Sequence, residues 1–152
     1  MKTILIIEND TQTRTIVREF TAHTPSSTNH SVVFPSIPKL SECFNFIEAN
    51  YHQQISLRDV AQAVGYSPAY LTDLVRRQTG QSVCRWIIKR RMAEARRLLL
   101  VTSQSVQAIA EAVGYFDTSY FIRQFRQLNG IPPQAWRKAH QSHGKPYQLT
   151  SD

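Results

Sequence analysis

The sequence predicts a mainly α-helical fold: two helix-turn-helix units joined by a long helix, preceded by a short N-terminal strand and helix. The first observation is an internal duplication, because residues 57–86 recur as residues 106–136 at an offset of 49 that becomes 50 after one inserted residue. The second is the helical spacing of apolar residues within each copy. Four of the five glycines also stand in equivalent pairs, which are Gly65 with Gly114 and Gly80 with Gly130.

The N-terminal residues predict a buried strand followed by a helix. Residues 4–7 are apolar and rich in β-branched side chains, and they run directly into Glu8, Asn9 and Asp10. This opening resembles a response-regulator receiver domain, but the second expected acid is an amide and no later strand offers a phosphoacceptor aspartate. We therefore interpret residues 1–21 as a truncated receiver-like segment without phosphotransfer chemistry.

A linker and a covering helix are predicted next. Residues 22–39 combine Pro, Ser, Thr and Asn without a sustained period, which is typical of a linker. A helix is expected from Ser41 to about Asn50, where it can cover the first unit. Its apolar face consists of Phe44, Ile47 and Tyr51.

The first unit consists of two short helices joined by a tight turn. The apolar residues of its first helix follow the i, i+3, i+4, i+7 spacing, and they are Leu57, Val60, Ala61 and Val64. Gly65 follows where this helix must stop and turn. Ser67 can cap the second helix, which has Pro68 in its first turn. The second helix buries Leu71, Leu74 and Val75.

A long helix and a second copy of the unit follow. Residues 82–100 lack glycine and proline, so they predict a continuous helix that fixes the separation and rotation of the two units. The second unit repeats the pattern, with Ser105 as its first cap and Phe121 and Phe125 in the second helix. The units and their covering helices together span residues 40–140, and residues 141–152 are predicted to be a disordered tail.

Charge and composition restrict the function. The chain carries a formal net charge of +7, and residues 56–140 hold 13 Lys/Arg against 5 Asp/Glu. This surplus suits a phosphate backbone, although a basic solvated face would have the same composition. Cys43 and Cys84 are far apart, and the histidines form no ligand-spaced cluster, so no metal, cofactor or enzymatic constellation is expected. The absence of a signal peptide or membrane-spanning run predicts a cytoplasmic protein.

Residues 112–137, which read AVGYFDTSYFIRQFRQLNGIPPQAWR, carry a family resemblance. With the first unit and the long helix, they resemble the DNA-binding domain of the AraC/XylS family of bacterial transcription regulators over roughly residues 40–140. The resemblance implies seven α-helices and two recognition helices in successive segments of the major groove. Two residues depart from the family pattern, Ile122 at a position that is more often small or polar and Asp73 as an acid on the first recognition helix.

The exposed faces of the two recognition helices supply candidates for base reading. These are Ala69, Thr72 and Asp73 in the first unit, and Thr118, Ser119, Ile122 and Arg123 in the second. Arg123 is the strongest candidate, because a guanidinium can donate two hydrogen bonds to guanine. Thr118 and Ser119 can equally cap their helix, Asp73 can pair with a nearby arginine, and Ile122 can rest against neighbouring side chains.

Four arginines are candidates for phosphate contacts, namely Arg76, Arg77, Arg90 and Arg126. Paired aromatic residues recur in the two copies, and their repetition favours core packing. They are Tyr66 with Tyr115, Tyr70 with Tyr120, and Trp86 with Trp136.

The function that these features favour is sequence-specific binding of double-stranded promoter DNA. Regulation would follow by recruiting or obstructing RNA polymerase, without an effector domain or a complete receiver. Two units in one chain can occupy about one helical turn of spacing, so a monomer suffices in principle. Two alternatives remain open: a phosphorelay protein, and an accessory protein that coats DNA by charge or competes with a longer relative.

Overall fold

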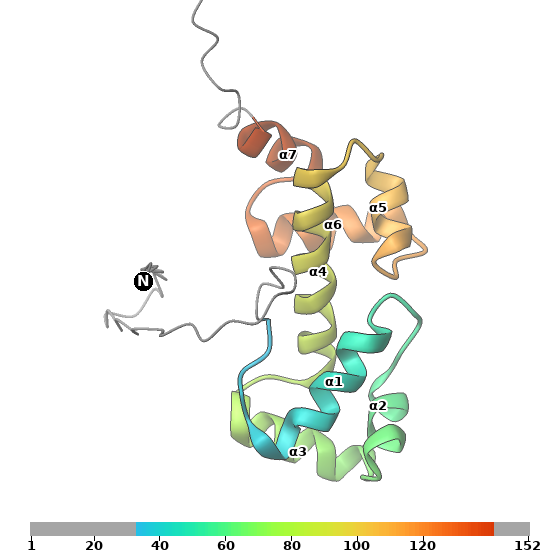
Figure 1. The fold of residues 1–152 in the computed structure, drawn as a ribbon, viewed down its shortest axis with the longest axis vertical. Helices are drawn as coiled ribbons and strands as arrows, with labels where there is room; N and C mark the ends of the chain where they lie inside the picture. Colours follow the sequence, from blue (N-terminus) through green and yellow to red (C-terminus); the bar gives the residue numbers. More distant parts are fainter. Residues whose placement is uncertain (1–32, 142–152) are drawn as a thin grey trace, which may run out of the picture. The chain divides into compact units, whose positions relative to one another are not determined.

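The computed structural model describes residues 33–141, and every regular element among them is a helix. The elements, seen in Figure 1, are the 3-10 helix η1 (Pro38–Leu40) and the α-helices α1 (Ser41–Asn50), α2 (Leu57–Val64), α3 (Pro68–Thr79), α4 (Val83–Val101), α5 (Val106–Ala112), α6 (Thr118–Asn129) and α7 (Pro133–Gln141). This confirms the predicted mainly α-helical fold. The predicted N-terminal strand and helix, residues 22–32 of the linker, and the tail from residue 142 lie outside the described residues.

The first unit is built from α1, α2, α3 and the start of α4 around one apolar core. Its fully buried members include Leu40, Ile47, Val60, Leu71 and Val75. The end of the predicted linker takes part in this core: the Phe34 ring stacks on Phe44 with 4.8 Å between centroids and also contacts Trp86. Residues 34–40 therefore belong to the first unit, because they bury apolar side chains that a free linker would expose.

The second unit has a separate core formed by α5, α6, α7 and the end of α4. Its buried members include Ile109, Ala110, Val113, Phe121 and Phe125. Trp136 of α7 packs edge-on against Phe125, with 6.1 Å between the ring centroids. The α7 residue Arg137 is also buried, and it donates hydrogen bonds to the backbone carbonyls of Leu99 and Gln104. These bonds fasten α7 to the end of α4.

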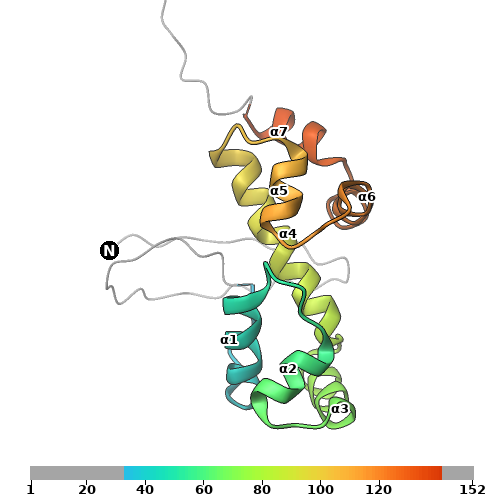
Figure 2. The ribbon, with the colours of Figure 1, turned by 90° about the vertical axis from the view of Figure 1, so that its right-hand side faces the viewer.

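Helix α4 belongs to both cores. Its first part contributes Val83, Trp86 and Ile87 to the first core, and its last part contributes Met92, Ala95 and Leu99 to the second. Figures 1 and 2 show it running continuously between the two units. The predicted long helix is thus confirmed, and it lacks a glycine or proline at which it would readily kink.

The predicted helix ends have the expected chemistry. The hydroxyl of Ser67 accepts a hydrogen bond from the amide of Tyr70, and that of Ser105 accepts one from Ala108. Gly65 ends α2 in the left-handed conformation with φ at 74°, which a glycine adopts without steric cost. The turn of the first unit is therefore fixed by local sequence. None of the helices in residues 33–141 is both long enough and apolar enough to cross a bilayer.

Candidate nucleic-acid interface

Helix α3 presents a polar face opposite its buried stripe. Leu71, Leu74 and Val75 are buried, whereas Ala69 and Asp73 are exposed. Two polar contacts on this face join residues within α3. The half-buried Thr72 donates its hydroxyl to the carbonyl of Pro68 at 2.8 Å, and Asp73 forms an ion pair with Arg77 at 2.5 Å. The pairing of Asp73 with an arginine, anticipated as an alternative to base reading, is present in the structure.

Helix α6 presents the equivalent face in the second unit. Ser119 and Arg123 are exposed, and the Arg123 guanidinium lies 5.8 Å from the centre of the Tyr120 ring. This cation–π contact holds the guanidinium near the helix surface without occupying its hydrogen-bond donors. Ile122 is half-buried and packs against the second core, as expected for the alternative in which it rests on neighbouring side chains.

The N-terminus of α6 is capped by Asp117. Its carboxylate accepts hydrogen bonds from the amides of Ser119 and Tyr120 at 2.8 and 3.1 Å. The interpretation of Thr118 or Ser119 as the cap is therefore wrong. Asp117 precedes both residues, and its carboxylate already accepts the backbone amide hydrogen bonds that a cap would accept. The exposed Ser119 hydroxyl and the half-buried Thr118 side chain are not used for capping.

Arginines stand at equivalent places along the two recognition helices. Arg76 of α3 and Arg126 of α6 are both exposed in the last turn, four residues before a glycine that ends the helix. Arg77 is exposed as well, although Asp73 holds it. Figure 2 shows α3 and α6 on the same side of α4, so one partner could meet both helices.

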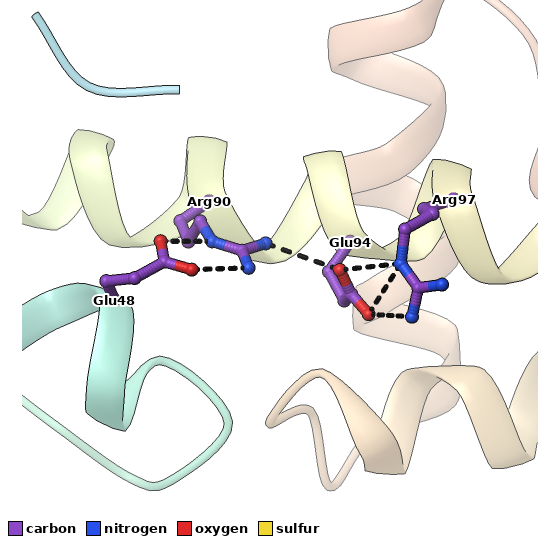
Figure 3. Close-up of polar contacts among 4 residues, drawn as sticks. All are labelled: Glu48, Arg90, Glu94 and Arg97. Atoms are coloured by element: carbon purple, nitrogen blue, oxygen red, sulfur yellow. Dashed lines mark hydrogen bonds and ion pairs between the residues drawn. The ribbon is translucent and has the colours of Figure 1, made fainter. Parts of the chain in front are cut away.

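The expectation that Arg90 contacts a phosphate is corrected by the structure. The residue is 6% exposed, and its guanidinium donates to both carboxylate oxygens of Glu48 while Glu94 lies 3.5 Å away (Figure 3). The ring of Tyr51 covers the guanidinium at 4.2 Å. A buried charge requires such partners, so Arg90 connects α1 to α4 and is not available to a surface ligand.

The paired aromatic residues divide into two groups. Trp86, Trp136 and Tyr115 are buried, as the repetition predicted. The prediction of core packing is wrong for Tyr66, Tyr70 and Tyr120, which are all exposed. The rings of Tyr66 and Tyr70 meet edge-on at 5.0 Å, beside the start of α3. These three tyrosines therefore belong to the surface, with Tyr70 on α3 and Tyr120 on α6.

Phe116 is a large apolar residue on the surface, at a position without a counterpart in the first unit. It is 86% exposed and directly precedes the Asp117 cap of α6. Phe116 thus offers an apolar side chain to a partner that approaches the start of α6. The signal in the sequence is the one-residue insertion in the second copy. Tyr115 matches Tyr66 at an offset of 49, whereas Asp117 matches Ser67 at an offset of 50, so Phe116 is the inserted residue.

In the part of the chain that the structure describes, no group of three His, Cys, Asp or Glu side chains could hold a metal ion. The two cysteines are unpaired, with Cys43 buried and Cys84 exposed. Helices α3 and α6 each carry a side-chain cap and a polar, arginine-bearing face, which can donate hydrogen bonds and attract an anionic partner.

Comparison with known proteins gives consistent results. Residues 60–139 match a family model described as a helix-turn-helix domain. The regulatory protein PocR of Salmonella typhimurium is 33% identical over 115 residues, which are 76% of this chain and 38% of PocR. The chain thus spans well under half of this relative's length.

Two solved structures share the fold. A transcriptional regulator from Chromobacterium violaceum, described as containing an AraC-type DNA-binding domain, is 30% identical with a TM-score of 0.65, over 71% of this chain and 96% of that chain. The DNA-binding domain of the global transcriptional factor AdpA, solved in complex with a target DNA, is 26% identical with a TM-score of 0.66, over 69% of this chain and 95% of that chain.

Proposed function

Because the chain belongs to the AraC-type helix-turn-helix family of DNA-binding transcription regulators, we propose that it binds specific sequences of double-stranded DNA and regulates transcription there. The observation that carries this proposal is the presence of two capped helices, α3 and α6, each with a polar outer face and an exposed arginine in its last turn. A helix of this kind fits the major groove, where base edges are distinguishable.

Direct base reading is assigned chiefly to the second unit. Arg123 can donate two hydrogen bonds to guanine O6 and N7, and Ser119 lies on the same face near the helix N-terminus. In the first unit the candidates are Ala69, Thr72 and Asp73, where Asp73 can accept from a cytosine amino group once Arg77 turns to a phosphate. Thr118 and Ile122 are half-buried and make smaller contributions.

Phosphate contacts are assigned to Arg76, Arg77 and Arg126. These side chains are exposed at the ends of the recognition helices, where they can position the protein without reading sequence. With two units in one chain, a monomer occupies two motifs, and regulation follows from recruiting or obstructing RNA polymerase at the promoter. The basic surplus of residues 56–140 favours association with DNA but does not supply specificity.

Selection of bound sequences from a random duplex library, at two salt concentrations, tests the proposal. We expect two short motifs spaced by about 10 to 10.5 base pairs, recovered at both concentrations. Recovery of no motif, with affinity collapsing as salt rises, would mean that the chain binds DNA by charge alone and would contradict the proposal.

A further inference from the structure

The two units touch directly, in addition to being joined by α4. The contact is made by the loop of residues 51–56, between α1 and α2, against the turn of the second unit at Gly114 and against Arg91 of α4. We call this set of interactions the inter-unit contact. Its members come from both units, so it forms a second connection between them.

Gly114 allows the loop to approach closely. A Cβ atom at this position would lie 2.9 Å from the carbonyl oxygen of Tyr51 and 3.1 Å from the carbonyl group of His52. The equivalent Gly65 of the first unit has nothing within 4 Å of the same point. Both glycines have a positive φ, but the backbone contact is particular to Gly114. The second unit is thus shaped to receive the loop.

Gln54 supplies a hydrogen bond across the contact. Its side-chain amide donates to the carbonyl of Gly114 at 2.8 Å, across 60 residues of sequence. The neighbouring Gln53 has the same side chain, but its amide donates only to the side-chain oxygen of Asn50 at the end of α1, at 3.4 Å. The two glutamines therefore form a natural pair of test and control positions.

Arg91 completes the contact from the middle of α4. Its Nε donates to the carbonyl of Tyr51 and its Nη2 to that of Gln53, both at 2.7 Å. The guanidinium also lies 5.4 Å from the centre of the Tyr115 ring, which follows Gly114 in the second turn. One side chain thus engages the loop of the first unit and an aromatic residue of the second.

A second connection restricts how far the two units can swing relative to each other about α4. A continuous helix fixes the units approximately, but long helices bend gently, so a single helix leaves some swinging of one unit relative to the other. The inter-unit contact lies at this middle region, because Arg91 falls between the α4 residues Ile87 of the first core and Met92 of the second. Swinging would have to break the Gln54 and Arg91 hydrogen bonds, so the contact restricts it.

We propose that the inter-unit contact sets the spacing at which the two units read their DNA motifs, with Gln54 and Gly114 as positioning residues. This inference rests on the function proposed above. Preorganised units bind two correctly spaced motifs together without first losing orientational freedom, and they discriminate against other spacings. Gln54 is uncharged, so its replacement leaves the electrostatic attraction to phosphates unchanged.

The test compares Gln54→Ala with Gln53→Ala on duplexes that carry both selected motifs at the preferred spacing or at spacings changed by one and two base pairs. For Gln54→Ala we expect a loss of affinity at the preferred spacing of about twofold to tenfold, the value of one net hydrogen bond. Its preference among spacings should also become weaker. Binding to duplexes with a single motif should match that of the wild-type chain, as should every value for Gln53→Ala.

A second measurement separates this inference from the proposed function, because it needs no DNA. Spin labels on the exposed Cys84 and on a Gln127→Cys substitution in α6 report the distance between the units. We expect a narrow distance distribution that broadens in Gln54→Ala and not in Gln53→Ala. An unchanged distribution, or an unchanged spacing preference, would overturn the inference. Failure of the wild-type chain to select any motif would instead overturn the proposed function.

Discussion

Glu48 of α1 and Arg90 of α4 form a two-point ion pair, with Arg90 Nε 2.6 Å from Oε2 and Nη2 2.8 Å from Oε1 of Glu48. The pair continues along α4, since Glu94 approaches Arg90 and also binds Arg97 at 2.6 Å (Figure 3). The hydrogen bond from Arg97 is the main cause that lowers the pKa of Glu94. The covering helix α1 is therefore tied to α4 by charge as well as by apolar contacts.

Glu48→Ala should lower the free energy of unfolding by about 1–3 kcal/mol, because it leaves the buried Arg90 with the more distant Glu94. The partial exposure of Glu48 keeps the loss below that of a fully buried pair. Urea unfolding measures this difference. Glu42→Ala, at an exposed position of the same helix, serves as control and should cost less than about 1 kcal/mol. Equal losses in the two variants would contradict the assignment.

Arg123→Ala should weaken binding to the selected DNA by about 1–3 kcal/mol and relax the preference at one base position. Arg126→Ala, three residues later on α6, should weaken binding uniformly across sequences and reduce the salt dependence by about one phosphate contact. Titration of a set of single-base variants at several salt concentrations distinguishes the two effects. Unchanged affinity and unchanged preference at every base in Arg123→Ala would remove it from the base readers.

Gly114→Ala should destabilise the protein more than Gly65→Ala. Both substitutions place a Cβ on a backbone with positive φ, which costs about 1–2 kcal/mol. Only at Gly114, of these two, does the new Cβ also collide with the backbone of Tyr51 and His52. Gly114→Val should be worse still, to the point of unfolding or misaligning the second unit. Thermal unfolding of the variants decides this, and equal melting temperatures would argue against a close contact at Gly114.

Asp59 makes the stability of α2 depend on pH. Hydrogen bonds from the hydroxyl and then the amide of Ser56 lower the pKa of Asp59. A carboxyl with a depressed pKa in the folded state stabilises it above the unfolded value of about 3.9, and this stabilisation is lost as pH falls through the folded pKa. Asp59→Asn should therefore unfold more easily than wild type at pH 7, with the difference shrinking below about pH 4. A difference that is the same at pH 7 and pH 3 would refute this role.

The two thiols should differ in reactivity. Cys84 is exposed, whereas Cys43 is buried and burial raises its pKa to about 11, so little thiolate forms at neutral pH. A thiol reagent added to the folded protein should modify Cys84 quickly and Cys43 only after unfolding. Cys84→Ser should abolish the fast phase. Rapid reaction of Cys43 in that variant would show that the first core opens readily.

Local chemistry explains which elements could be predicted. Some features depend only on neighbouring residues, and the sequence predicts them. These are the caps Ser67 and Ser105, the turn at Gly65 and the continuous helix α4. The burial of Arg90 could not be predicted in this way, because its partner Glu48 lies 42 residues away in the sequence. The exposure of Tyr70 and Tyr120 also escaped prediction, since a residue repeated in two units can be shared core or shared surface.

Asp73 and Arg123 occupy equivalent positions of the duplicated unit, and they carry opposite charges. The two recognition helices therefore cannot exchange places on a duplex, even though their backbones follow the same plan. A chain bound as we propose would have a single polarity along the DNA axis, unlike a two-fold symmetric dimer on a palindrome. If the target site were inverted relative to the promoter, the whole bound protein would be reversed along the DNA. A surface that had faced the promoter would then face away from it.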